Sequence, residues 1–436
     1  MQDHTHLLSR RSLLRSAGWL GAGLTGSTLL PGRLLAQASA EEMYPTVTNL
    51  VYDYVASGRL AGAVAALGWG SNAPAQIARG SMAFDSSAPV DLDSLYRIYS
   101  MTKPITGMAA MMLVDEGKIG LDQPISDFLP KFAQMQVQVT PDGSITELKP
   151  VLTPITLRHL LTHTAGLGYS IIQKGPIKEA YEAAGLVPGQ ASRMAIPPFS
   201  GVKTVPSLAQ FADKLAEMPL VYEPGTRWSY SVALDLVGRI IEVVSGQDFA
   251  AFLAARIFGP CGMASTGFQV SAAQAPRLTT NYVIHDGKTD PIDPGATSVY
   301  LDPPAFPFGG AGLVSSPRDY DRFLMMLAGG GAIGTTRVMS EAAVRLGTSN
   351  LLPASADLAG TWVAGAGFGA GGRVGLGPDA GTYGWSGAAG TVGFVNTRVG
   401  LRAGLFVQFM PSSALPLSEE FPKAVLTDIS AMKKAA

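Results

Sequence analysis

The amino-acid sequence predicts an α+β fold in which a sheet is built from both ends of the chain and a mainly helical region is inserted between them. Two observations support this prediction. Short strand-like runs broken by glycine occur between residues 62 and 84 and again after 360, whereas apolar residues at helical spacing dominate the stretch between. The chain also has no internal repeat and no low-complexity linker. Segregated strands and helices of this kind are typical of an α+β protein.

The first 120 residues predict a helix, two strands and a second helix. Residues 41–58 carry apolar side chains on one side of a helix. The runs "GAVAALGWG" and "AQIARGSMAF" are short and interrupted by glycine, which is typical of adjacent strands. The second helix is expected to begin close to Pro104, because proline is tolerated in the first turn of a helix, and to end at Gly117.

The middle of the chain predicts a hairpin followed by helices. "VQVTPDGSITEL" places a Pro-Asp-Gly turn between alternating residues, and Thr156 is suited to cap a helix in "TPITLRHLLTHTAGL". Residues 165–205 are expected to form a loop with one helical piece near 177–185. The other helices expected here are 207–217, a segment that ends at Gly246, and 248–258.

From about residue 300 the chain changes to a glycine loop, a helix and then strands. The loop and helix are expected in "FPFGGAGLVSSPRDYDRFLMMLAGGG", and a last helix is expected near 417–434. Strand candidates punctuated by glycine lie between them, at 361–369, 381–385, 390–397 and 401–409.

The composition excludes several classes of protein. The 436 residues are 47% hydrophobic and 15% charged, which is ample for a thick core and disfavours disorder. The formal net charge is −1 and there is no basic tract, so nucleic acid is not an expected partner. We expect no cofactor. The single cysteine, Cys261, cannot form an intramolecular disulfide and is interpreted as a buried structural thiol.

Residues 1–38 predict an export leader. Arg10 and Arg11 precede the apolar stretch "AGWLGAGLTGSTLLPG", and "AQA" then supplies small residues for cleavage near Ala38. The pattern resembles a twin-arginine signal. Its apolar part is too short and too rich in glycine to span a bilayer. We therefore expect a periplasmic protein with no stable membrane span, and a retained membrane anchor or a disordered tail is the alternative.

The segment "RIYSMTKPITG" places Ser100 and Lys103 on one face of the predicted helix start. Hydrolysis of an acyl compound needs a nucleophile, a base and donors for the oxyanion, and this pair could supply the first two. A lysine acts as a base only where burial or a nearby cation disfavours its ammonium form. The positive end of a helix has the same effect and stabilises an anion at the serine. By itself, however, the pattern also describes an N-capping serine beside a solvated lysine.

Five stretches in combination resemble the class C β-lactamase and penicillin-binding-protein superfamily, and most closely its serine carboxylesterase branch, often called family VIII. In the order of that family they are "YRIYSMTKPITG", "LLTHTAGL", "PGTRWSYSVALDLVG", "FGGAGLVSSPRDYDRF" and "GWSGAAGTVGF". The resemblance implies a β-lactamase-like fold with an antiparallel sheet, flanked by helices, from residues 41–97 and 300–436. It implies a mainly helical domain from 98–299 and an active site in the cleft between the two.

The resemblance also assigns catalytic roles. It implies that Ser100 is the nucleophile and that Lys103 belongs to its activating pair. The second motif of the family matches Tyr230 in "SYSV", whose phenol would relay the serine proton and later activate water. Without the family, Tyr230 would be interpreted as a core aromatic residue whose hydroxyl is satisfied by the backbone.

The third motif of the family matches Trp385-Ser386-Gly387. The resemblance implies that these residues bind substrate and that the N–H of Ala388, together with that of Ser100, holds the oxyanion. Trp385 is expected to shape an apolar pocket. Further candidates for that pocket are Tyr169, Phe306 and Phe308, for which ordinary core packing is the alternative.

Two departures from the β-lactamase pattern indicate the substrate class. Val232 stands where β-lactamases have an asparagine, and Trp385 stands where they have a lysine. Both lost groups are polar contacts to a β-lactam, and an apolar pocket holds a carboxylate poorly. We therefore expect a serine carboxylesterase that hydrolyses short to medium acyl esters, with a small-molecule ester as its partner. The oligomeric state is left open.

Other functions remain open on the same scaffold. They are a β-lactamase or D-amino-acid peptidase, an acyltransferase, and a penicillin-binding protein that is acylated without turnover. A nucleophile elbow at "GWSGA" is disfavoured, because the last histidine, His285, precedes Ser386 and that fold needs one after the serine. His159 and His163 lie four residues apart, but no third ligand is evident, so we expect no metal.

Overall fold

The computed structural model describes residues 39–187, 189–194 and 204–435. The predicted export leader, residues 1–38, lies outside the described residues. Residues 195–203 of the predicted loop do so as well. Within the described part of the chain, no helix combines the length and the apolar character that a bilayer span requires.

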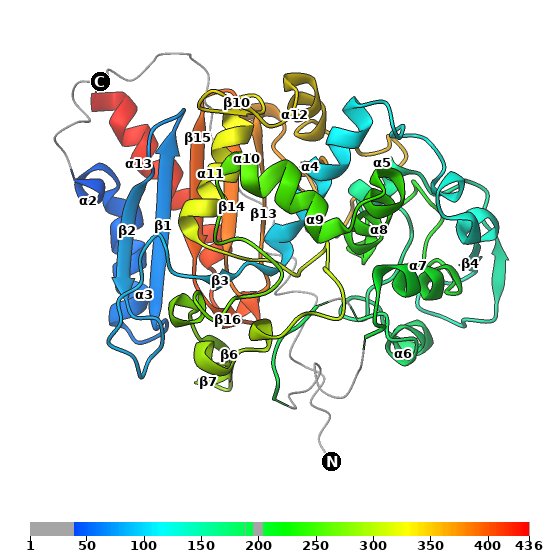
Figure 1. The fold of residues 1–436 in the computed structure, drawn as a ribbon, viewed down its shortest axis with the longest axis horizontal. Coiled ribbons are helices and arrows are strands. Elements are labelled where there is room, and N and C mark those ends of the chain that lie inside the picture. Colours follow the sequence, from blue (N-terminus) through cyan, green and yellow to red (C-terminus); the bar gives the residue numbers. More distant parts are fainter. Residues whose placement is uncertain (1–38, 188, 195–203, 436) are drawn as a thin grey trace.

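The centre of the fold is a seven-stranded antiparallel sheet built from both ends of the chain (Figure 1). Its strand order is β11-β12-β13-β14-β15-β1-β2, and every neighbouring pair is antiparallel. The predicted α+β fold with an antiparallel sheet flanked by helices is confirmed. The strands are β1 (Gly62–Trp69), β2 (Ala75–Gly80), β11 (Gly367–Phe368), β12 (Arg373–Val374), β13 (Thr382–Ser386), β14 (Val392–Asn396) and β15 (Leu401–Phe406).

Helices cover both faces of this sheet. One face packs against α2 (Ala40–Met43), α3 (Pro45–Ala56) and α13 (Leu417–Ala435), and the other packs against α11 (Pro317–Ala328). Alternate residues of β1 therefore enter different cores. Ala65 lies in the cluster with α3 and α13, whereas Val64 and Ala66 lie in the larger cluster with α11. Burial on both faces explains why β1 is a continuous apolar run rather than an alternating one.

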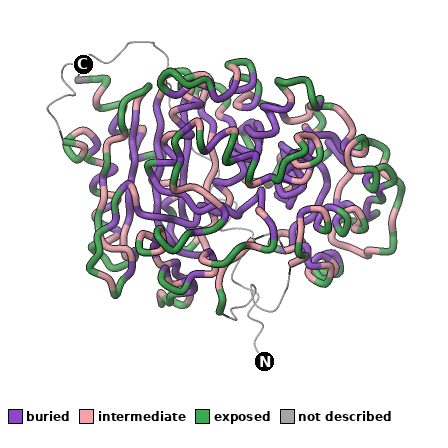
Figure 2. The backbone as a smooth tube through the Cα atoms, in the orientation of Figure 1, coloured by how far each residue is buried: buried purple, intermediate pink, exposed green. Residues whose placement is uncertain are grey.

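The inserted region is mainly helical and buries a long central helix, α4 (Thr102–Asp115). Figure 2 shows buried residues both along the strands of the sheet and in the inserted helical region. Thr156 caps α5 through the N–H of His159, and Gly246 ends α8 with a φ of +70°, both as predicted. The other elements are the hairpin β4 (Gln136–Gln138) and β5 (Leu148–Pro150), and the helices α5 (Leu157–Leu161), α6 (Gly175–Ala183), α7 (Leu208–Ala216), α8 (Ala233–Ser245), α9 (Phe249–Leu253) and α10 (Gly259–Cys261).

Several predicted boundaries were wrong. Of the strand predicted at 361–369, only β11 forms, because residues 361–366 form turns. The helix predicted at 248–258 becomes a π-helical turn after Leu253. The sequence patterns also missed β6 (Asn281–His285) and β7 (Lys288–Asp293), which join β16 (Phe409–Met410) in a small sheet. Thus two strands inside the stretch 98–299, which we expected to be mainly helical, pair with the C-terminal part of the chain.

The same part of the chain contributes a buried ion pair that anchors the backbone before Ser100. Arg97, on β3 (Tyr96–Arg97), is fully buried, and its Nε donates to Asp293 Oδ2 at 2.6 Å. The guanidinium also donates to Ser298 Oγ at 3.0 Å. Breaking a buried pair costs several kcal/mol, on the order of 3–5, because the remaining charge is left without a partner. The ion pair therefore fixes the backbone segment that leads to Ser100.

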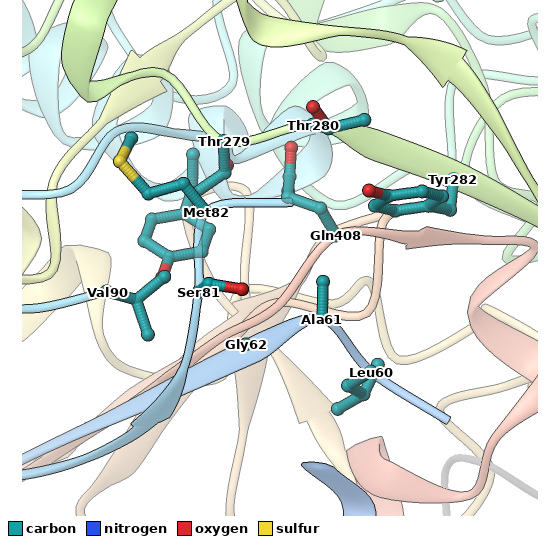
Figure 3. Close-up of a pocket in the computed structure, with 11 residues that line it drawn as sticks. Leu60, Ala61, Gly62, Ser81, Met82, Val90, Thr279, Thr280, Tyr282 and Gln408 are labelled. Atoms are coloured by element: carbon teal, nitrogen blue, oxygen red, sulfur yellow. The ribbon is translucent and has the colours of Figure 1, made fainter. Parts of the chain in front are cut away.

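A small cavity lies between β1, β2 and β6 (Figure 3). It is lined by Gly62, Ser81, Thr280 and Tyr282, among others, and has a volume of about 10 Å³. That is the space for a single water molecule and is too small for an ester. The residues that line it do not include Ser100, Lys103 or Tyr230. It is not a candidate for the active site.

Candidate active site

Ser100 lies in a 3₁₀ turn, Tyr99–Met101, that leads directly into α4. Pro104 falls in the first turn of α4, as predicted, although the helix begins at Thr102. Tyr99 has a φ of +40°, an uncommon conformation for a residue with a side chain. Such local strain is often found beside catalytic groups. No side chain caps the N-terminus of α4, so the alternative of an N-capping serine was wrong.

Three side chains that the sequence motifs singled out meet at one point. Lys103 Nζ lies 3.2 Å from Ser100 Oγ, and Tyr230 Oη donates to the same oxygen at 2.7 Å. Lys103 Nζ also lies 4.6 Å from the centre of the Tyr230 ring. The Lys103 side chain is buried, with 1% of its surface exposed. The alternative of a solvated lysine was therefore wrong.

The Lys103 amine has a further partner that the sequence patterns missed. It donates to the carbonyl of Gly310 at 2.6 Å. The N–H of Gly310 in turn donates to Oδ1 of Asp235, a buried residue of α8, at 2.9 Å. Burial raises the pKa of Asp235 to about 6, although the positive charge of Lys103 and the N–H of Gly310 oppose that rise. Neither residue was predicted from the sequence to belong to the site.

The two histidines of "HLLTH" have structural contacts. His159 Nδ1 accepts the N–H of Thr156 at 3.2 Å. His163 Nδ1 accepts the N–H of Ser231 at 3.2 Å, and the His163 ring lies 4.7 Å from that of Tyr230. Burial, followed by the positive charge of Lys103, holds the pKa of His163 well below its usual value, so this ring is neutral. His163 thus supports the segment that carries Tyr230. Among the described residues, no cluster of three or more potential ligands could hold a metal ion.

The third motif lies at the end of β13, next to the Ser100 turn. A Cβ on Gly387 would overlap the carbonyl of Ile98, so only glycine allows this close approach of the two segments. Ala388 packs against the small cluster that contains Tyr99. In the described part of the chain, the N–H of Ala388 donates to no backbone carbonyl in the turns and loops.

Ser386 is not on a nucleophile elbow. It ends strand β13 and pairs with Val392 of β14, whereas an elbow stands on a turn from a strand into a helix. The elbow interpretation of "GWSGA" is therefore excluded.

Aromatic rings surround Tyr230. Trp385 Nε1 donates to Tyr230 Oη at 3.4 Å, and the Trp362 ring lies 5.0 Å from the Tyr230 ring. Tyr169 lies 5.8 Å from it, but it is buried, with 7% of its surface exposed, and belongs to the main hydrophobic core. Trp362 was missed, because a lone tryptophan in a loop carries no sequence signal.

The other apolar candidates are core residues. Phe306 and Phe308 have 4% and 1% of their surface exposed and pack against each other. For these two, the core-packing alternative is confirmed. Val232 is completely buried at the start of α8 and places an apolar group where β-lactamases have an amide.

The comparison with protein-family models matches residues 47–420 to the family described as Beta-lactamase. The chain belongs to the β-lactamase family. The resemblance inferred from the five stretches is thereby confirmed. Among curated relatives, an uncharacterised protein of Mycobacterium tuberculosis is 35% identical over 325 residues, which are 70% of this chain and 75% of the relative. Esterase EstB of Burkholderia gladioli is 32% identical over 283 residues, which are 61% of this chain and 65% of EstB.

The solved structures give the same fold. EstCE1, described as a hydrolase with promiscuous acyltransferase activity, superposes with a TM-score of 0.69 at 24% identity. The match covers 88% of this chain and 99% of EstCE1. The β-lactamase-like fold is confirmed, and the chain is a hydrolase of this family with homologues among its esterases and acyltransferases.

Proposed function

We propose that this enzyme is a serine carboxylesterase that hydrolyses short to medium acyl esters through an acyl-enzyme on Ser100. One observation carries the proposal: Ser100 Oγ lies within hydrogen-bonding distance of both the Lys103 amine and the Tyr230 phenol. A nucleophile beside a base is the arrangement that acyl transfer requires. The relationship to esterase EstB supports the choice of an ester.

In the acylation step, the Lys103–Tyr230 pair takes the proton of Ser100 while Oγ attacks the ester carbonyl carbon. The N–H groups of Ser100 and Ala388 donate hydrogen bonds to the carbonyl oxygen and stabilise the negative charge that develops on it. The tetrahedral intermediate then expels the alcohol, which takes up the proton from the pair. The acyl group remains bound to Ser100 Oγ.

In the deacylation step, a water molecule gives a proton to the same pair and attacks the acyl carbon. The bond to Ser100 Oγ breaks, and the serine regains its proton. The carboxylic acid leaves. Lys103 and Tyr230 share the proton in both steps.

The residues around Ser100, Lys103 and Tyr230 favour neutral apolar esters. Trp385 and Trp362 lie against Tyr230, and buried Val232 adds no polar contact. Without the lysine that β-lactamases have at the position of Trp385, the carboxylate of a β-lactam has no cation to bind there.

We expect kcat/KM for p-nitrophenyl butyrate to exceed that for a chromogenic cephalosporin by at least about 100-fold, because a site built without the required polar groups discriminates strongly. Both values are measured spectrophotometrically on the same preparation. Comparable turnover of the two would favour a β-lactamase or D-amino-acid peptidase. A persistent acyl adduct in intact-protein mass spectra, without turnover, would indicate a penicillin-binding protein.

Acyl transfer is the second candidate, because EstCE1 is described as combining hydrolase and acyltransferase activities. The same acyl-enzyme would then be attacked by an alcohol instead of water. Chromatography of reactions with an added alcohol distinguishes the two. A transesterification product formed faster than free acid would favour the transferase.

We also propose that residues 1–38 direct the protein to the periplasm by the twin-arginine route, with cleavage near Ala38. The paired Arg10 and Arg11 support this proposal. Replacing both with lysine is expected to retain the full-length chain in the cytoplasmic fraction, as measured by immunoblotting of cell fractions. Unchanged export of that variant would contradict the proposal.

A further inference from the structure

We propose that Asp235 is a positioning residue of this site, which holds the Gly310 carbonyl against the Lys103 amine and thereby orients the base toward Ser100. The inference rests on the proposed function and extends it to a residue that does not touch Ser100. It also gives a physical role to the glycine loop "FGGAG".

The contacts form a continuous path from α8 to α4. Asp235 Oδ1 accepts the N–H of Gly310 at 2.9 Å, and the carbonyl of the same residue accepts Lys103 Nζ at 2.6 Å. The adjacent Gly309 carbonyl accepts Thr106 Oγ1, on the next turn of α4, at 2.7 Å. The glycine loop is therefore fastened to both helices.

Only glycine fits at these two loop positions. A Cβ on Gly310 would lie 2.6 Å from Asp235 Oδ2, and a Cβ on Gly309 would overlap the carbonyl of Leu234. The loop backbone can approach α8 this closely because neither residue has a side chain. The two glycines therefore allow the loop backbone to contact the Asp235 carboxylate.

The Gly310 carbonyl determines how the amine is oriented. A carbonyl oxygen only accepts hydrogen bonds, so it always faces an N–H of Lys103. In the neutral amine this leaves the lone pair free to face Ser100 Oγ, which lies 3.2 Å from Nζ. A catalytic group misplaced by about 1 Å can lose about 100-fold in rate. Loss of the Asp235 contact should therefore lower kcat more than it changes KM.

The test compares Asp235→Ala and Asp235→Asn with a matched control, Asp319→Ala, using p-nitrophenyl butyrate. Asp319 is also buried and accepts a backbone N–H, that of Ser265, at 2.6 Å, but it belongs to α11 and lies outside the site. The measurements are kcat, KM, Tm, and the fraction of enzyme labelled by a covalent phosphonate.

We expect Asp235→Ala to lower kcat by about 10- to 100-fold with KM within about threefold, because the base loses its orientation. Asp235→Asn keeps an oxygen for the Gly310 N–H, so it should restore kcat to within about fivefold of wild type. Asp319→Ala should lower Tm while kcat stays unchanged.

Wild-type kcat in Asp235→Ala would overturn the inference. So would an equal loss of kcat in Asp319→Ala at an equal loss of Tm, or a kcat in Asp235→Asn no higher than that of Asp235→Ala. If Asp235→Ala does not fold, Asp235→Val, which also removes the acceptor of the Gly310 N–H, is measured in its place with the same expected results. Failure of the proposed function is distinguishable, because wild-type enzyme would then neither hydrolyse the ester nor react with the phosphonate.

Discussion

Replacing Ser100 with alanine is expected to lower kcat/KM for p-nitrophenyl butyrate by at least about 1,000-fold, as loss of a catalytic nucleophile does in other serine hydrolases. The Ser100 hydroxyl is the group to which both the Lys103 amine and the Tyr230 phenol point. Without that oxygen, no acyl-enzyme can form. The rate is measured by release of p-nitrophenol, and acylation by mass spectrometry after phosphonate treatment.

A matched control for this experiment is Ser340→Ala. Ser340 caps α12 (Glu341–Gly347) by accepting the N–H of Ala343 at 2.9 Å, so its loss should cost about 1 kcal/mol of stability and no activity. Unchanged hydrolysis in Ser100→Ala would remove Ser100 from the mechanism. Phosphonate labelling at a different serine in wild-type enzyme would have the same consequence.

Tyr230→Phe is expected to lower kcat by about 100- to 10,000-fold, the range associated with loss of a general acid–base group. The substitution deletes only Oη, which donates to Ser100 Oγ at 2.7 Å. The ring remains, so its contacts with Trp362 and Lys103 are preserved, and KM and Tm should change little. Steady-state kinetics and thermal unfolding of the same preparation measure both.

Tyr96→Phe is the control for removal of a buried phenol hydroxyl. Tyr96 is buried and is one of the residues that line the small cavity beside β1 and β2, and its Oη has no hydrogen-bond partner among the described residues. This variant should retain wild-type kcat. A Tyr230→Phe enzyme as active as Tyr96→Phe would show that Lys103 acts without the phenol.

Much of the site could be predicted from sequence because its signals are local. Ser100 and Lys103 share a face by spacing alone, and Thr156 and Gly246 mark helix ends through their own backbone preferences. Tyr230 was found only through the family motif, since a single tyrosine before a helix has no periodic signal.

The residues that were missed act over long sequence separations. Gly310 meets Lys103 across about 200 positions, and Trp362 reaches Tyr230 from a loop that has no periodicity. The strand predicted at 361–369 failed for a related reason. Residues 361–366 form turns, and Trp362 in these turns packs against Tyr230.

The sequence by itself determined the helix ends at Thr156 and Gly246 and the serine–lysine spacing, because each depends on neighbours within one or two turns of the chain. The tertiary structure alone decided that the Lys103 amine is buried and that the phenol of Tyr230, just before α8, reaches Ser100. It also decided that Asp235 holds the loop at Gly310 through a hydrogen bond. Burial and these hydrogen bonds arise only when segments far apart in the chain pack together and exclude water, and that packing converts a common four-residue pattern into a candidate catalytic site.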